Sequence, residues 1–303
     1  MKIEDIKQIL IIGSGTMGQM IGFHYAACGY AVTFYDVSRE LLDQIPEKAG
    51  KQAAAYVQAN RLTREAADAA LARIRSTDDP SDAGRDADLV SESVPEDPEL
   101  KAQVFARFNE VCPARTIFTT NTSSLAPSEF AGQTGRPEKF AAFHFHDLRF
   151  NRVVDIMPHP GTAEKTLDLI EALAIKAELL PIRLKKESPG YVFNHMLMHW
   201  LHSAQSLAAN GVAEVEDVDR AWMGAMLTHV GPFGIMDSIG IDTVWKITDY
   251  WGKKHQDPQE MANANFLKTY VDKGLLGAKT GQGFYTYPNP AFVQPGFVEN
   301  KES

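Results

Sequence analysis

The chain of 303 residues has only two cysteines, Cys28 and Cys112. Two cysteines are too few for a disulfide framework, and their spacing matches no metal-binding motif. We therefore expect no structural metal and a reducing, cytoplasmic setting.

Long apolar runs and an excess of basic charge are also missing. The N-terminal MKIEDIKQ contains acids and its apolar continuation is short, so neither a signal peptide nor a membrane span is predicted. Asp and Glu outnumber Lys and Arg by 39 to 30, and the net charge of -9 argues against a nucleic-acid surface. A local basic pocket for an anionic ligand stays compatible with this charge.

What remains is an ordinary globular composition, with 44% hydrophobic and 23% charged residues. A chain of this length exceeds a typical single core, so two domains are expected. Strand and helix patterns alternate over the first part, which predicts βαβ units in a parallel sheet. From Ser188 to Tyr287 the strand signal disappears, and the tail after Pro288 is expected to be loose. The fold class predicted is α/β, with a Rossmann-type doubly wound domain at 1–187 and an all-α domain at 188–303.

A glycine-rich turn follows the first predicted strand, residues 9–12. This apolar run suits a strand buried on both faces. In the following GSGTMG, the first glycine allows a tight turn, the second a close approach of a pyrophosphate, and the third close packing of the next helix. The helix N-terminus then presents amides to the phosphates. The predicted cofactor contacts are Gly13, Gly15, Thr16, Met17 and Gly18.

Asp36 ends the second predicted strand, residues 31–35, at the spacing of roughly 20 residues at which a carboxylate takes the ribose hydroxyls. This favours NAD, because the 2′-phosphate of NADP would meet a like charge. Arg39 leaves NADP open. Glu92, Glu96 and the segment 121–124 follow later strands, at the sheet edge where ligands bind.

Two further apolar stretches, 141–146 and 153–157, are separated by a short polar loop. If both are extended, His144 and His146 share one face, and a neighbouring strand sets Asp155 opposite His144. A carboxylate beside an imidazole suits a general base that takes a proton from an alcohol. From the residues alone, either histidine is an equal candidate, and each is more often a structural group. Asn194 is an amide in an otherwise apolar helical stripe, where it needs partners.

Several motifs follow one another along the chain: IGSGTMG, SESVPED, NTSSL, His144-Phe145, SPGYVFN, GPFGIMDSIGID and GAKTGQGFYTY. In this the chain resembles the 3-hydroxyacyl-CoA dehydrogenase family, of the 3-hydroxybutyryl-CoA dehydrogenase type. The resemblance implies an oxidoreductase of fatty acid metabolism, with NAD and a short-chain 3-hydroxyacyl-CoA thioester meeting in a cleft, and a homodimer formed through the helical domain.

Position by position, the resemblance implies that His144 is the catalytic base and that Asp155 stands for the family's paired glutamate. Ser123 matches a serine near the reacting oxygen, and Asn194 an asparagine on the first helix of the second domain. The remaining cofactor contacts implied are Asp36, Glu92, Glu96, Lys101 and Asn121. One departure is informative: the chain reaches its carboxylate one residue sooner, through His146 and an altered loop at 147–152 near the expected acyl pocket.

Two alternatives stay open. The altered loop and the acidity also fit a dehydrogenase of a free 3-hydroxy acid, carnitine or sugar acid. A non-catalytic NAD-binding protein is the other, although the retained His144, Asp155 and Asn194 argue against it.

Overall fold

The computed structural model describes residues 1–149 and 151–299, and the chain forms two compact units. The first extends from Met1 to Val192, and the second begins at Phe193. The boundary predicted near Glu187 thus falls in the last residues of the first unit.

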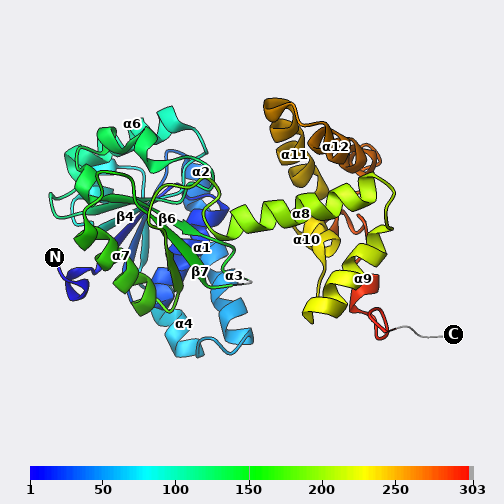
Figure 1. Ribbon diagram of the computed structural model, residues 1–303. Helices are drawn as coiled ribbons and strands as arrows, with labels where there is room; N and C mark the ends of the chain where they lie inside the picture. The colour runs from blue at the N-terminus through cyan, green and yellow to red at the C-terminus, as the bar shows by residue number, and fades with distance from the viewer. Residues whose placement is uncertain (150, 300–303) are drawn as a thin grey trace. The chain divides into compact units, whose positions relative to one another are not determined.

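An eight-stranded sheet forms the centre of the first unit (Figure 1). Its order is β3-β2-β1-β4-β5-β6-β7-β8, and neighbouring strands are parallel except for the antiparallel pair β6 and β7. The order reverses at β1, so the sheet is doubly wound as predicted. The strands are β1 (Gln8–Ile12), β2 (Ala31–Tyr35), β3 (Ile74–Thr77), β4 (Leu89–Glu92), β5 (Ile117–Thr120), β6 (Phe140–Phe145), β7 (Val153–Met157) and β8 (Leu180–Arg183).

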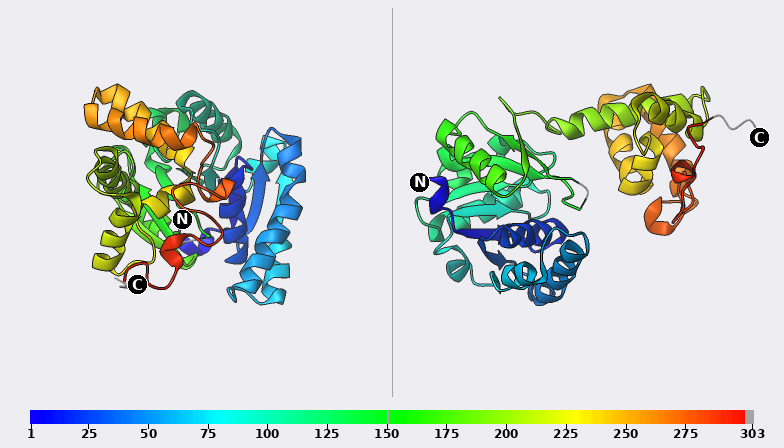
Figure 2. Two further views of the ribbon diagram at one scale, coloured as in Figure 1. Left: turned by 90° about the vertical axis from the view of Figure 1, so that its right-hand side faces the viewer. Right: turned by 90° about the horizontal axis from the view of Figure 1, so that it is seen from below.

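Side chains of β1 alternate between two apolar cores, one on each face of the sheet. Ile9 and Ile11 pack into the first core and Leu10 and Ile12 into the second. Both faces are covered by helices (Figure 2), which is why the buried part of β1, residues 9–12, is apolar throughout. On the first face lie α1 (Thr16–Ala27), α3 (Ile45–Gln58), α4 (Arg64–Leu71) and α7 (Glu164–Lys176), and on the second α5 (Pro80–Gly84) and α6 (Pro98–Val111).

The helical stretch after β2 is divided by its own sequence. A short α2 (Arg39–Asp43) precedes α3, and Pro46 lies in the first turn of α3, where a missing N–H costs nothing. Thr63 begins α4 by accepting a hydrogen bond from the Ala66 amide at 3.1 Å. Local capping chemistry thus sets the helix ends on this face of the sheet.

The second unit is helical, as expected. Leu201, Phe233 and Leu267 belong to its buried core. Its C-terminal segment is ordered against that core through Phe292 and Phe297, so an expectation that the chain is loose after Pro288 is wrong over these residues. The helices, coloured from yellow-green to orange in Figure 1, are α8 (Phe193–Ala209), α9 (Val215–Met226), α10 (Pro232–Ile239), α11 (Ile241–His255) and α12 (Pro258–Val271).

None of the described helices is both long enough and apolar enough to span a bilayer.

Candidate functional site

The glycine turn after β1 is shaped by close backbone contacts. Gly13 has a φ of +95°, and a Cβ there would lie 2.6 Å from the carbonyl oxygen of Ser93. A Cβ on Gly18 would lie 1.9 Å from the Gly13 oxygen, so neither position accepts a side chain. Gly15 differs, because a Cβ there meets nothing within 4 Å. The space beside Gly15 is therefore open to a ligand.

This open space lies at the N-terminus of α1, whose N-cap is Gly15. The first amides of a helix have no intrahelical acceptor, so those of Thr16 and Met17 suit a pyrophosphate. Asp36 follows β2 and is held by two backbone donors, the Ser14 amide at 2.7 Å and the Ser38 amide at 2.9 Å. Its remaining lone pairs suit ribose hydroxyls. These residues fit NAD.

Glu92 and Lys101 form a buried ion pair beside this turn. Both side chains are almost fully buried, and the Lys101 Nζ lies 2.8 Å from the Glu92 carboxylate. The Thr120 hydroxyl donates to the other Glu92 oxygen at 2.6 Å. Burial raises the pKa of Glu92, against the opposing effect of Lys101. The pair therefore joins the end of β4 to α6 and to the end of β5.

Glu96 organises the loop after β5. Its carboxylate accepts hydrogen bonds from the Thr122 hydroxyl and from the Ser123 and Ser124 amides. Burial opposes ionisation of Glu96, but these bonds and the charge of Lys101 hold its pKa below the ordinary value. The loop is tied to β6 as well, because the Asn121 side-chain oxygen accepts from the Phe145 amide at 2.8 Å. Ser123 is fixed in place by these contacts.

A cavity of about 290 Å³ opens where these loops meet. It lies at the carboxyl ends of the parallel strands, where ligands bind in doubly wound sheets. Its lining brings together six of the predicted site residues. The cavity is lined by Met17, Ser93, Val94, Glu96, Lys101, Asn121, Ser123, His144, Phe145 and Asp147.

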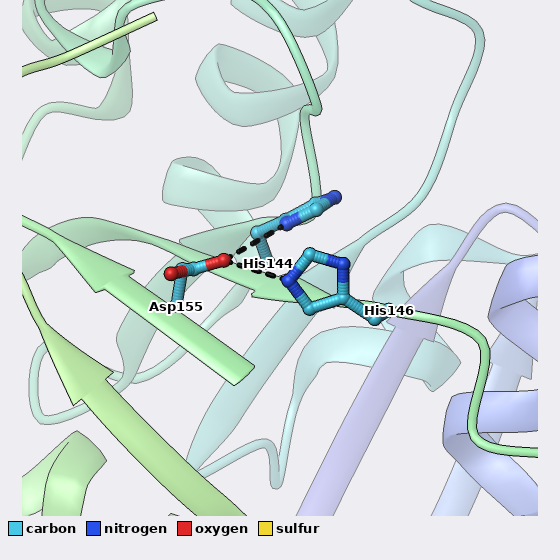
Figure 3. A group of neighbouring side chains, drawn as sticks. All are labelled: His144, His146 and Asp155. Atoms are coloured by element: carbon cyan, nitrogen blue, oxygen red, sulfur yellow. Dashed lines mark hydrogen bonds and ion pairs between the residues drawn. The ribbon is translucent and has the colours of Figure 1, made fainter. Parts of the chain in front are cut away.

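His144 and Asp155 are directly opposite each other in the antiparallel register of β6 and β7, as the alternation predicts. The His144 Nδ1 lies 3.6 Å from the Asp155 Oδ2. The same oxygen lies 2.8 Å from the Nε2 of His146, which follows β6 (Figure 3). The hydrogen-bonding distance is thus the one to His146, which sequence patterns alone did not separate from His144.

All three side chains are buried, and their charges influence one another. Burial lowers the pKa of His144, while Asp155 works in the opposite direction. Burial alone would raise the pKa of Asp155, but the two histidines lower it. The arrangement therefore favours an ionised Asp155 beside a neutral His144, which is the protonation state a general base needs.

Tyr191 was not predicted as part of the site. Its ring is stacked on the His144 imidazole, with centroids 4.6 Å apart and planes inclined by 8°. Its hydroxyl donates to the Thr122 carbonyl at 2.6 Å. The positive φ of Tyr191, +54°, is the backbone conformation that points this ring. The sequence signal that could have identified Tyr191 was the SPGYVFN motif, which contains it.

Asn194 lies at the start of α8, in the second unit, and is half-buried. Its place near the reacting oxygen stays a prediction.

The donor set of His144, His146 and Asp155 is the one group in the described residues that is compact enough to hold a metal ion. Two ligands of a tetrahedral zinc ion lie about 3.3 Å apart at ordinary bond lengths. The 2.8 Å between His146 and Asp155 is instead a hydrogen-bond distance. The geometry is that of a hydrogen-bonded cluster.

Two family models together match nearly the whole chain. The NAD binding domain of 3-hydroxyacyl-CoA dehydrogenase matches residues 8–188, and the C-terminal domain of that enzyme matches residues 190–287. A probable 3-hydroxybutyryl-CoA dehydrogenase of Bacillus subtilis is 31% identical, over an alignment that covers 93% of this chain and 98% of that relative.

Solved structures are similar over the same extent. A diketoreductase, described as catalysing reactions of dicarbonyl compounds, is 37% identical with a TM-score of 0.87, over 93% of this chain and 99% of that one. The (S)-3-hydroxybutyryl-CoA dehydrogenase of Ralstonia eutropha is 27% identical with a TM-score of 0.83, over 94% and 100%. The predictions of an oxidoreductase and of NAD are confirmed. The chain therefore belongs to the 3-hydroxyacyl-CoA dehydrogenase family.

Proposed function

We propose that the protein interconverts 3-hydroxyacyl-CoA and 3-oxoacyl-CoA with NAD, favours short acyl chains, and serves fatty acid metabolism. The observation that carries the proposal is the position of His144. It lines the cavity at the strand ends while Asp155 lies behind it. An imidazole so placed can take the proton of a hydroxyl group in the cavity.

The glycine turn and Asp36 would hold the cofactor. Gly13 and Gly18 fix the turn, Gly15 leaves the space, and the amides of Thr16 and Met17 meet the phosphates. When bound, NAD supplies the hydride acceptor for oxidation, and NADH the hydride donor for reduction.

Proton movement would fall to His144. Its Nδ1 faces Asp155, so Nε2 is the atom that accepts the hydroxyl proton during oxidation and returns it during reduction. The charge of Asp155 stabilises the protonated ring. Ser123, which lines the cavity, and Asn194 would donate hydrogen bonds to the reacting oxygen.

Glu92, Glu96, Lys101 and Asn121 were predicted as cofactor contacts. Glu96, Lys101 and Asn121 line the cavity and can touch a ligand. Glu92 is fully buried and would act through Lys101. Their shared task is to hold the loops after β4 and β5 in register with β6.

A free dicarbonyl compound is the second candidate substrate. It is supported by the diketoreductase, which has the highest identity among the structures compared above. It is also supported by the altered loop, where Asp147 lines the cavity and is paired with Arg149. Because this pair leaves little net charge at the cavity, uncharged substrate groups fit beside it.

The test is NADH oxidation with acetoacetyl-CoA, acetoacetate and an uncharged diketo ester. We expect the highest kcat/KM for acetoacetyl-CoA. Turnover confined to the diketo ester would favour the second candidate. Tight NADH binding without turnover of any of them would favour a non-catalytic protein.

We further propose a homodimer formed through the second unit, in the cytoplasm. Large apolar side chains are exposed on this unit, as a face that packs on a second copy requires. Light scattering on the eluting protein should give twice the 33.5 kDa of one chain. Cell fractionation should recover it with cytoplasmic markers. The exposed side chains include Met196, Leu207, Val212, Met226, Leu227 and Trp251.

A further inference from the structure

The carboxylate of Asp155 lies between two histidines, but it bonds only one of them. Its Oδ2 accepts from His146 Nε2 at 2.8 Å and lies 3.6 Å from His144 Nδ1. Hydrogen bonds of this kind are usually 2.7 to about 3.2 Å long. The proton of His146 therefore occupies the oxygen that faces His144.

Two atoms in this cluster lack a hydrogen-bond partner among the described residues. They are the Nδ1 of His144 and the Oδ1 of Asp155, both buried. Unpartnered buried atoms are uncommon and costly. Because these two groups face each other, a direct bond between them is available and is not made. The hydrogen bond from His146 therefore keeps the carboxylate turned away from this arrangement.

We propose that His146 is a positioning residue for His144. Its Nε2–H donates to Asp155 and keeps this carboxylate from bonding His144, so that His144 stays a neutral imidazole. This inference rests on the proposed function, because it assigns His146 a part in setting the base. His146 touches the carboxylate and, unlike His144, is not in the cavity lining.

The ring arrangement supports this division of tasks. The two imidazoles meet nearly edge to face, with centroids 4.7 Å apart and planes at 79°. His146 thus packs against His144 while its Nε2 points at Asp155 (Figure 3). Tyr191 covers another side of the His144 ring. The His144 imidazole thus packs between the rings of Tyr191 and His146, and His146 also bonds the Asp155 carboxylate.

The charges around His144 come from four parts of the first unit. Asp155 on β7 and Glu96 before α6 raise its pKa, whereas burial and His146 lower it. Lys101 on α6 is paired with Glu96 at 3.4 Å, and Tyr191 contributes an uncharged ring. Asp147 and Arg149 offset each other at the cavity. Asp155 is therefore the charge whose distance from His144 matters most.

Two variants separate the hydrogen bond from the bulk of the ring. His146→Phe keeps an aromatic ring but removes the donor, so Asp155 is free to turn to His144 Nδ1. His146→Gln keeps an N–H near the position of Nε2 and cannot titrate in this range. Asp155 is already near His144, and a direct hydrogen bond to it would stabilise the protonated ring further and raise the pKa of His144 by about one unit.

The first readout is an NMR pH titration of the His144 Cε1 proton, identified by its absence in His144→Asn. We expect an upward shift of about one unit in His146→Phe and little change in His146→Gln. The acid limb of kcat/KM for alcohol oxidation should move with it. An unchanged His144 titration in His146→Phe, or an equal shift in His146→Gln, would overturn the proposal.

Thermal melting and NADH binding check that each variant is folded, and His146→Met replaces the Phe variant if that one does not fold. The NMR titration needs no substrate. If no thioester or dicarbonyl compound is turned over, the proposed function fails while the titration still decides the role of His146.

Discussion

Tyr191 lies flat on the imidazole of His144, with ring centroids 4.6 Å apart, and is anchored to Thr122 through its hydroxyl. Tyr191 is the next-to-last residue of the first unit, which ends at Val192. The base of the site is therefore packed against the segment that leads into the second unit.

From this stack we predict different costs for two substitutions. Tyr191→Leu removes the ring, and since an aromatic pair contributes about 1 kcal/mol, kcat should fall by roughly fivefold. Tyr191→Phe keeps the ring and loses only the bond to Thr122, so its loss should be smaller. NADH affinity should change in neither. Steady-state kinetics with NADH titration measure both, and equal losses in the two variants would contradict a role for the stack.

The glycine turn provides a matched pair of substitutions. Gly18→Ala places a Cβ against the Gly13 carbonyl, so the fold itself should be strained and the melting temperature should drop. Gly15→Ala meets no protein atom, so the melting temperature should hold while NADH affinity falls by tenfold or more, because the methyl group occupies ligand space. Calorimetry and fluorescence titration separate the two. Full NADH affinity in Gly15→Ala would remove the cofactor from this turn.

The second unit should have a pH-dependent stability that comes from Asp219. Burial raises the pKa of this carboxyl to about 6, despite hydrogen bonds from the Phe233 and Gly234 amides and the Tyr285 hydroxyl. The ordinary pKa in the unfolded chain is about 3.9. The folded state therefore holds the proton more tightly, and this stabilisation is complete below about pH 4 and lost as pH rises through about 6.

Urea unfolding at several pH values between 4 and 7 tests this effect. Asp219→Asn should be less stable than the wild type at every pH, because an amide cannot accept all three bonds. Its free energy of unfolding should, however, fall less steeply with pH over this range. Identical slopes for the two proteins would show that Asp219 titrates normally.

The parts of this account that could be predicted from sequence are those fixed by local pattern. The apolar run of β1, the glycines after it and Asp36 follow one another directly, and so the cofactor turn could be located. The opposition of His144 and Asp155 followed from strand alternation alone. Each of these features depends on chain neighbours or on one pair of strands.

The parts that could not be predicted depend on side chains from distant segments. Which histidine bonds Asp155 is decided by reach in three dimensions, because His146 lies just beyond β6. The stack of Tyr191 joins β6 to the end of the first unit. The ordered C-terminal segment was missed because Phe292 and Phe297 are widely spaced and show no period.

The most direct test of the central claim, that His144 is the base of an NAD-dependent dehydrogenase, is the turnover of His144→Ala. In this direction His144 returns a proton to the reacting oxygen, so loss of its general acid–base catalysis should lower kcat with acetoacetyl-CoA and NADH by about 10²–10⁴-fold. NADH affinity and melting temperature should stay near those of the wild type. A variant that binds NADH and retains the wild-type kcat would contradict the account.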